Sequence, residues 1–372
     1  MELEVGAVGH GGICVAHAPD GRVVLVRHAL PGERVRVAIT EEKKSFLRAD
    51  AVEVLEASPH RVEPPCPFAG PGRCGGCDWQ HVELSEQRRF KAEVIETALR
   101  RIANVERPVT VEAVPGDDHG LRWRTRMRLA VGADGTVGLH RHRSNEIEPI
   151  TDCLIAHPSL PVASVVEEEW PDVEAVDLQA TDTVEAAGRT WRIPEGGFWQ
   201  VHPGAPDALV AAVRRFATLE PADVCVDLYA GVGLFAGALA PLVPHGDVIA
   251  VESVAEAADA ATANLADLPN VTVVTEKVAR WLRHTNDGAD VVVLDPPRRG
   301  AGPDVVAGIV KRGPRRVVYV ACEPSALARD IAAFAEHGWE LADLSAYDLF
   351  PMTSHVECVA LLTPKPRPRQ GT

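Results

Sequence analysis

Short apolar runs alternate with segments of helical periodicity along the second half of the chain. Each run is rich in valine, leucine and alanine, which is typical of a strand buried on both faces of a sheet. The strands predicted in this way are Val224–Leu228, Asp247–Val251, Val271–Val274, Asp290–Leu294, Val317–Ala321 and Val356–Leu362. Because helical segments separate the runs, the pattern predicts an α/β fold with a parallel sheet and right-handed crossovers.

The first 59 residues show a different pattern, in which turn-forming residues separate short strand-like runs. Glycine, proline and aspartate interrupt the runs at residues 9–12, 19–21 and 30–33. The predicted strands are Leu3–Val8, Ile13–His17, Arg22–Arg27, Arg34–Ile39 and Phe46–Leu55. Short strands at this spacing predict a small β-barrel of the oligonucleotide-binding type.

A central α+β domain is predicted over residues 60–190, between the barrel domain of residues 1–59 and the α/β domain of residues 191–372. Apolar residues at helical spacing predict an amphipathic helix from Leu84 to about Ile102. A strand at Arg122–Val131 would carry four guanidinium groups on one face, since every second residue is an arginine: Arg122, Arg124, Arg126 and Arg128. This face is either a solvated surface or an RNA-binding patch.

The net charge of −15 argues at first sight against a nucleic-acid partner, because phosphate binding requires lysine and arginine. However, the first 150 residues are nearly balanced in charge, and almost all of the acidic excess follows them. The chain has no run of eighteen apolar residues and does not begin like a signal peptide. We therefore expect a cytoplasmic protein with no membrane contact, and nothing in the chain implies an obligate protein partner.

Three cysteines, Cys66, Cys74 and Cys77, occur close together, and two glycines between the last two permit a tight turn. Three thiols are an incomplete tetrahedral set, and Cys153 is the best candidate for the fourth ligand. Such a set suits a Cys₄ iron–sulfur cluster or a structural zinc ion. The second C-x-x-C of a zinc ribbon is missing, which favours the cluster. Unliganded thiols are the remaining alternative.

Four polar or reactive residues stand at the carboxyl ends of successive predicted strands: Asp227, Glu252, Asp295 and Cys322. In an open parallel sheet these ends line one crevice, so we expect the four side chains to converge there. Any one of them could be a core or surface residue by chance, but that explanation is weak for all four together.

The turn after the first of these strands admits two ligands. Gly231 and Gly233, with Ala236, satisfy the dinucleotide fingerprint, and Glu252 stands near the position of an acid that binds a ribose, so NAD is one alternative. Asp227 four residues before Gly231 gives D-x-x-x-G-x-G, which resembles the S-adenosylmethionine loop of class I methyltransferases. The Asp-Pro-Pro sequence that begins at Asp295 favours the methyl donor.

Cys322 suggests which atom would be methylated. C5 of uracil is a poor nucleophile until a thiolate adds to C6, and a base must then remove the C5 proton so that the thiolate can leave. Cys322 fits the nucleophile, and His355 and Glu357, at the entrance to the last strand, are candidates for the base. Arg298 follows Asp-Pro-Pro, where enzymes that methylate exocyclic amines usually have an aromatic residue.

The chain resembles the bacterial RNA uracil-5-methyltransferases, which act on tRNA or large-subunit ribosomal RNA. The resemblance covers the whole chain and rests on six motifs in order: Cys66…Cys74-Gly75-Gly76-Cys77…Cys153, Phe198-Trp199-Gln200-Val201, Asp227–Gly233, Leu294–Arg298, Tyr319–Pro324 and Phe350–Glu357. It implies a TRAM barrel, a four-cysteine [4Fe–4S] site and a class I methyltransferase domain that uses S-adenosylmethionine.

The resemblance also implies roles for individual residues. Cys322 would be the nucleophile and Glu357 the base, and five residues would line the cofactor and uridine pocket: Gln200, Tyr229, Gly231, Glu252 and Asp295. The chain departs from the family at Glu323, where asparagine is usual, at His202, where asparagine is common, and in a longer gap between Cys66 and Cys74. A carboxylate at Glu323 should oppose formation of the Cys322 thiolate unless it is paired or turned away.

Two rival functions remain at this point. A non-catalytic RNA-binding protein or chaperone could keep the fold, although the presence of both Cys322 and Glu357 counts against it. A zinc-containing oxidoreductase could use the glycine turn for NAD.

Overall fold

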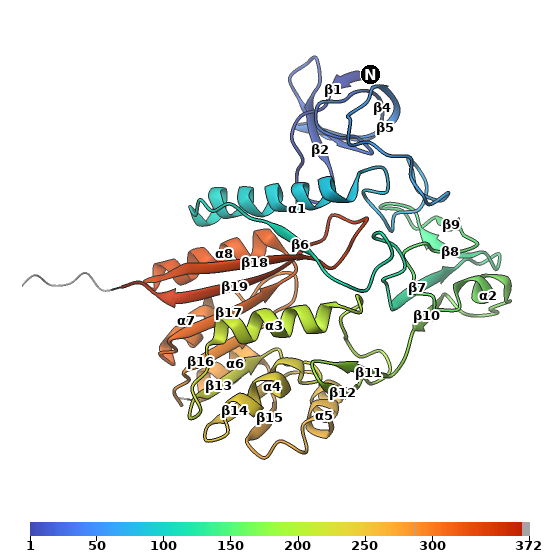
Figure 1. Ribbon diagram of the computed structural model, residues 1–372. Coiled ribbons are helices and arrows are strands. Elements are labelled where there is room, and N and C mark those ends of the chain that lie inside the picture. Colours follow the sequence, from blue (N-terminus) through green and yellow to red (C-terminus); the bar gives the residue numbers. More distant parts are fainter. Residues whose placement is uncertain (286, 367–372) are drawn as a thin grey trace, which may run out of the picture.

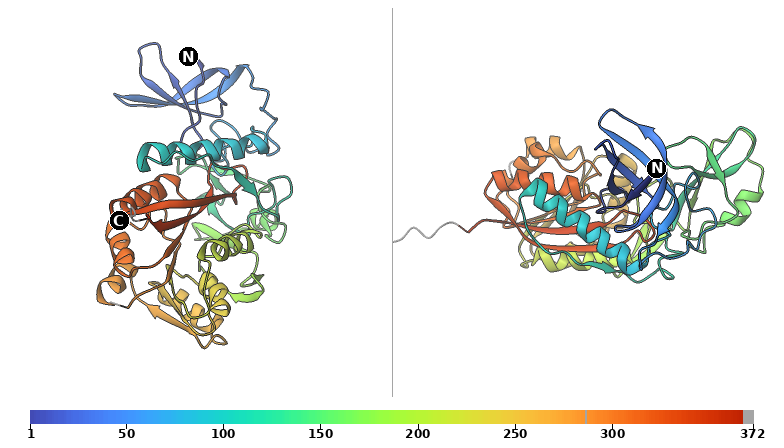
Figure 2. Two further views of the ribbon diagram at one scale, coloured as in Figure 1. Left: turned by 60° about the vertical axis from the view of Figure 1, so that its left-hand side comes forward. Right: turned by 90° about the horizontal axis from the view of Figure 1, so that it is seen from above.

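The structure is a computed structural model that describes residues 1–285 and 287–366. A small barrel, a mixed central region and a large α/β sheet follow one another along the chain (Figure 1). The barrel lies at one end of the molecule, and helix α1 (Leu84–Ala98) separates it from the large sheet (Figure 2). Within the described ranges, no helix has both the length and the apolar character that a membrane crossing requires.

The large sheet has, among the described residues, eight strands in the order β15-β14-β13-β16-β17-β19-β18-β6. Their bounds are β6 Val111–Ala113, β13 Val224–Leu228, β14 Asp247–Glu252, β15 Val271–Thr275, β16 Val291–Leu294, β17 Arg316–Ala321, β18 Trp339–Asp348 and β19 Glu357–Pro364. Strands β13 to β17 are parallel, and β19 is antiparallel to both of its neighbours, β17 and β18. The predicted α/β fold is confirmed, and β18 and β6 extend the sheet beyond the predicted strands.

Helices cover both faces of this sheet. On β16, Val291 and Val293 face a core that α3 and α4 complete, whereas Val292 and Leu294 face a core that α1, α6, α7 and α8 complete. The bounds are α3 Ala205–Ala217, α4 Leu234–Leu239, α5 Ala255–Asn264, α6 Val278–His284, α7 Pro303–Lys311 and α8 Pro324–Glu336; η2 (Ala240–Leu242) follows α4. Because every side chain of such a strand is buried, the strand appears in the sequence as an apolar run.

The N-terminal barrel contains the strands β1 (Glu2–Glu4), β2 (Cys14–His17), β3 (Val23–Arg27), β4 (Arg34–Glu42) and β5 (Phe46–Glu56). They pair in the order β1-β4-β5-β3-β2. In the first half of β4, buried and exposed side chains alternate, and Val35 and Val37 are buried. The predicted barrel is confirmed. Its core also takes Trp79 and Phe90 from beyond residue 59, so the barrel is packed onto the chain that follows it.

The central region contains the sheet β10-β7-β8-β9 and a separate hairpin. The bounds are β7 Arg126–Val131, β8 Val137–His140, β9 Ile147–Pro149, α2 Val162–Glu167, β10 Ala175–Gln179, β11 Thr183–Ala186 and β12 Arg189–Arg192.

The predicted strand at Arg122–Val131 was wrong in its first half. Arg122 has a left-handed backbone with φ of 57°, and the strand begins only at Arg126. The guanidinium of Arg122 donates to Asp152 at 2.7 Å, and that of Arg126 donates to the carbonyl of Gly197. The four arginines therefore do not form one face of a strand, because only Arg126 and Arg128 belong to β7.

Helix α1 and strand β6 precede the central sheet in the sequence but pack with the large sheet. The π-helical turn η1 (Leu99–Ala103) continues α1, and Ile95, Leu99 and Val111 belong to the core that covers β16 and β17. Strand β6 pairs with β18, with Val111 opposite Ala346.

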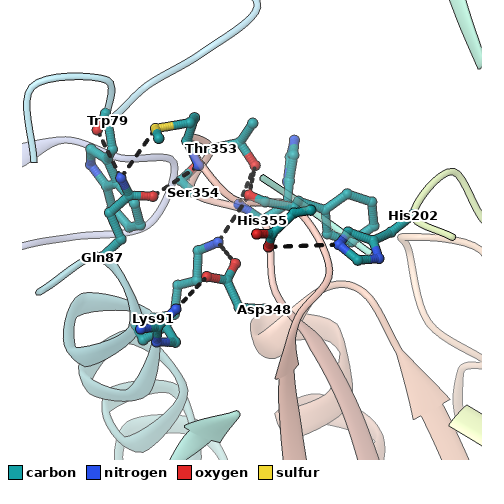
Figure 3. A network of polar contacts seen from close by, with 12 residues as sticks. Trp79, Gln87, Lys91, His202, Asp348, Thr353, Ser354 and His355 are labelled. Carbon is teal, nitrogen blue, oxygen red and sulfur yellow. Dashed lines mark hydrogen bonds and ion pairs between the residues drawn. The ribbon is translucent and has the colours of Figure 1, made fainter. Parts of the chain in front are cut away.

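A buried ion pair fixes α1 to the end of β18 (Figure 3). The ammonium of Lys91 is fully buried, is paired with the carboxylate of Asp348, and donates to the carbonyl of Phe350 at 3.0 Å. One turn earlier, Gln87 accepts a hydrogen bond from the amide of Met352 at 2.8 Å. Together they hold the segment that leads from β18 to the start of β19.

Replacing Lys91 with Met should lower the free energy of unfolding by about 3–5 kcal/mol, because it leaves the buried Asp348 carboxylate without its ammonium partner. Denaturant unfolding followed by circular dichroism measures this change. Lys44→Met, on the exposed turn between β4 and β5, is the matched control and should change stability by less than about 0.5 kcal/mol. Equal effects of the two substitutions would show that the ion pair contributes nothing.

Candidate active site

One large cavity of about 1490 Å³ opens at the carboxyl ends of the parallel strands. All three parts of the chain line it: His10 and Arg48 come from the barrel, Trp123 and His142 from the central region, and Cys322 from the large sheet. The cavity is thus enclosed by segments that are far apart in the sequence, as expected for the crevice of an open α/β sheet.

Cys322 and Glu357 are neighbours because of how β17 and β19 pair. In this antiparallel ladder Ala321 lies opposite Cys358, so the next pair outward is Cys322 and Glu357. Both residues line the cavity, and only 3% of Glu357 is exposed. The predicted nucleophile and the predicted base therefore stand side by side at the cavity wall.

Burial and like charges raise the pKa values of the reactive groups. Burial, with the charges of Glu357 and Asp295, raises the pKa of the Cys322 thiol to about 12. Burial raises the pKa of Asp295 to about 7. Burial and the Asp295 charge raise the pKa of Glu357 well above the usual carboxyl range, and Arg298 opposes that rise. In the free protein at neutral pH, the Cys322 thiol is accordingly protonated.

The backbone of the glycine turn after β13 is hydrogen-bonded to the end of β14, where Glu252 lies. Tyr229 adopts a left-handed backbone with φ of 65°, and its amide donates to the carbonyl of Val251 at 3.0 Å. The amide of Gly231 donates to Oε2 of Glu252 at 2.9 Å, and a side chain at Gly231 would meet no protein atom within 4 Å. Tyr229, Gly231 and Glu252 line the cavity together with Asp295 and Gln200.

Asp227 and Gly233, also predicted to bind the cofactor, are not among the residues that line this cavity. Oδ2 of Asp227 accepts a hydrogen bond from the amide of Ala236 at 2.8 Å, which fixes the start of α4, and burial raises the pKa of this carboxyl to about 8. Gly233 has a φ of 96°, and a Cβ there would lie 2.7 Å from Cδ1 of Leu265. In this structure Asp227 and Gly233 support the conformation of the glycine turn and do not face the cavity.

The four candidate cysteines line a second, smaller cavity of about 60 Å³ in the central region. Cys66, Cys74, Cys77 and Cys153 are all free thiols, and burial raises the pKa of Cys74 to about 11. In the described ranges, no three histidine, cysteine or acidic side chains are close enough together to hold a single metal ion. The four thiols thus line one cavity, but their sulfur atoms are not close enough together to coordinate a single metal ion.

Several residues at the cavity were not predicted from the sequence. His10, Arg48, His142 and Arg143 line it from the barrel and the central sheet. Periodicity carries no signal for them, because each is an ordinary polar residue of a loop or strand. The placement of Gln200 came only from the family motif Phe198–Val201.

The raised thiol pKa makes a prediction about Cys322 in the absence of RNA. At pH 8 its alkylation by iodoacetamide should be at least about a hundredfold slower than that of a peptide thiol, because only thiolate reacts. Since the pKa is about 12, the rate should increase about tenfold per pH unit from pH 7 to 10. Mass spectrometry of the peptide containing Cys322 measures the rate.

Arg298→Ala should slow this alkylation further, because Arg298 lowers the thiol pKa. Arg299→Ala removes the neighbouring charge as a matched control. A rate that stops rising below pH 9 would contradict the buried, protonated thiol.

Comparison with known proteins agrees with this geometry. A TRAM domain model matches residues 1–52, and a tRNA (Uracil-5-)-methyltransferase model matches residues 282–365. The chain is 44% identical to an uncharacterized RNA methyltransferase of Streptomyces avermitilis, over 98% of both chains. It is 35% identical to one of Bifidobacterium longum, over 97% of this chain and 96% of the relative.

The fold is also that of a solved structure. The Pyrococcus abyssi tRNA (uracil-54, C5)-methyltransferase in complex with S-adenosyl-L-homocysteine superposes with a TM-score of 0.70 and 22% identity, covering 97% of this chain and 99% of that one. The shared fold, the two matching domain models and the full-length relatives agree. The chain therefore belongs to the tRNA (uracil-5-)-methyltransferase family of RNA methyltransferases.

Proposed function

We propose that this protein methylates C5 of a uridine in structured RNA, either tRNA or large-subunit ribosomal RNA, with S-adenosylmethionine as the methyl donor. The adjacency of Cys322 and Glu357 at the wall of the large cavity carries this proposal. A thiol nucleophile and a base at one site are what carbon methylation of a pyrimidine requires, and neither NAD chemistry nor amine methylation needs both.

The covalent step is a conjugate addition. Sγ of Cys322, as the thiolate, forms a bond to C6 of the uracil, and the electrons of the C5–C6 double bond move to C5 and O4. When bound, S-adenosylmethionine would supply the electrophilic methyl group that C5 takes, with S-adenosylhomocysteine as the leaving group. Glu357 then removes the C5 proton, the C5–C6 double bond re-forms, and the Sγ–C6 bond breaks. A carboxylate whose pKa is raised binds a proton more tightly, which suits Glu357 to this role.

The residues around the glycine turn fit the methyl donor. The space above Gly231 is open, so a ligand can approach the backbone there, and Glu252, whose Oε2 accepts the Gly231 amide, lines the same cavity. Gln200, Tyr229 and Asp295 line the same cavity. We assign these five residues to the cofactor and uridine pocket, and Asp227 and Gly233 to the support of the turn.

The RNA would enter from the side of the barrel. Arg48 from the barrel, Arg124 and Arg143 from the central region, and Arg298 beside Cys322 all line the cavity. These guanidinium groups supply positive charge for RNA phosphates at the cavity. A uridine that is flipped out of the RNA could then reach Cys322. An RNA substrate of this kind places the protein in the cytoplasm.

The four cysteines fit an iron–sulfur cluster better than zinc. The chain lacks the second C-x-x-C of a zinc ribbon, which favours the cluster. Cys66, Cys74, Cys77 and Cys153 surround one cavity, and four thiolates can hold a [4Fe–4S] cluster there. When bound, the cluster would tie the loop of residues 66–77 to Cys153.

Replacing Glu357 with Gln should trap a covalent RNA–protein adduct, because the C5 proton can no longer be removed after methyl transfer. Turnover should fall by about a hundredfold or more. The adduct would be measured on denaturing gels with RNA from a strain that lacks this gene, and 5-methyluridine would be mapped in the product of the unmodified protein.

Two variants control this experiment. Glu340→Gln, on the exposed part of β18, should turn over normally, and Cys322→Ser should form no adduct. Normal turnover of Glu357→Gln would refute the assignment of the base. The absence of 5-methyluridine from the product of the unmodified protein would refute the proposed function itself.

Anaerobically purified protein should be brown and contain iron. Cys74→Ser or Cys153→Ser should remove most of the iron and the visible absorption, since each removes one of four ligands. Cys225→Ala, a buried thiol in β13, is the matched control and should leave the spectrum unchanged. A colourless protein with one zinc ion per chain would contradict the cluster.

A further inference from the structure

Glu323, the residue after the nucleophile, is held by two groups. It caps α8, where Oε1 accepts a hydrogen bond from the amide of Ser325 at 3.2 Å. Its other oxygen, Oε2, lies 2.9 Å from Nε2 of His10. The carboxylate therefore has one partner on its own helix and one on the N-terminal barrel, 313 residues away in the sequence.

The loop that carries His10 packs against Asp78 and Trp79 and against Ser354, which lies three residues before Glu357. The indole of Trp79 donates to the carbonyl of Gly12 at 3.3 Å, and a Cβ at Gly12 would lie 2.8 Å from Asp78 and 3.2 Å from Ser354. Oδ2 of Asp78 in turn accepts hydrogen bonds from the amide and hydroxyl of Ser354 at 3.0 and 2.8 Å. His10 thus reaches Glu323 from a packed loop, although its own side chain is largely exposed.

The charges around Cys322 show why this contact matters. Glu357 and Asp295 already raise the pKa of the thiol, and Arg298 is the cation that opposes them. An unpaired Glu323 carboxylate would add a further negative charge beside the thiolate and the incoming RNA phosphates. The contact with Glu323 raises the pKa of His10, so the imidazole carries more positive charge near neutral pH than a free histidine would.

We propose that His10 is a positioning residue for the methyl transfer: it holds the Glu323 carboxylate away from Cys322. The position of the barrel loop that carries His10 thereby affects the nucleophile. The inference rests on the proposed function for its catalytic consequence, but its effect on the thiol does not require RNA. It also accounts for how this chain accommodates a glutamate where its family usually has asparagine.

The first test measures alkylation of Cys322 by iodoacetamide at pH 7 in the free protein. His10→Ala should slow it about three- to fivefold, which is the range expected when a partly exposed ion pair is lost. His17→Ala, which removes an exposed imidazole from β2 of the same barrel, should not slow it. In a Glu323→Gln background, His10→Ala should slow it less than about 1.5-fold, because no carboxylate remains to be held.

The second test repeats the comparison with methyl transfer to RNA. His10→Ala should lower kcat about three- to fivefold, and Glu323→Gln should suppress that loss. His10→Gln, which keeps a hydrogen-bond donor, should restore part of the rate.

Equal losses from His10→Ala with and without Glu323 would overturn the proposal, since a contact with RNA or a structural role would not depend on the carboxylate. No loss in either assay would also overturn it. Failure of the proposed function would look different, because the unmodified protein would then transfer no methyl group while the alkylation result could still stand.

Discussion

The antiparallel pairing of β19 with β17 is the constraint on which the active site depends. The parallel strands end at the cavity, and only a strand that runs in the opposite direction can begin there. Strand β19 starts with Glu357 at the edge where β17 ends before Cys322. Because side chains alternate along a strand, a register shift of one residue would turn Glu357 to the other face of the sheet. Two side chains from segments 35 positions apart thus meet through backbone pairing alone.

The segment that leads into β19 is held from outside the large sheet. Lys91 and Gln87 on α1 fix Asp348 and the residues after it, and Asp78 fixes Ser354. These contacts come from parts of the chain that contain no reacting group. The segment that precedes the base is therefore held by contacts from outside the sheet, which support the placement of Glu357 at the start of β19.

Much of the sheet and its reactive edge could be predicted from the sequence. Strands buried on both faces are visible as apolar runs, and Cys322 could be recognised because it follows one of them. Strand β18 was missed because polar residues such as Glu340 and Asp343 interrupt its apolar pattern. The strand predicted to begin at Arg122 begins only at Arg126. Alternating arginines have the periodicity of a strand, but this periodicity does not reveal the left-handed backbone at Arg122. The hydrogen bond from the Ala236 amide to Asp227, a residue that does not line the cavity, could not be predicted from the spacing of the motif. Contacts such as His10 with Glu323 have no local signature at all.

The pairing of β6 with β18 also bears on how the molecule is made. Val111 belongs to the edge of a sheet whose neighbouring strand is synthesised more than two hundred residues later. Until Ala346 has left the ribosome, β6 has no neighbouring strand with which to pair. The last half of the chain, expressed by itself, would in turn expose an open strand edge at β18. The large sheet can therefore be completed only after β18, near the end of the chain, has been synthesised.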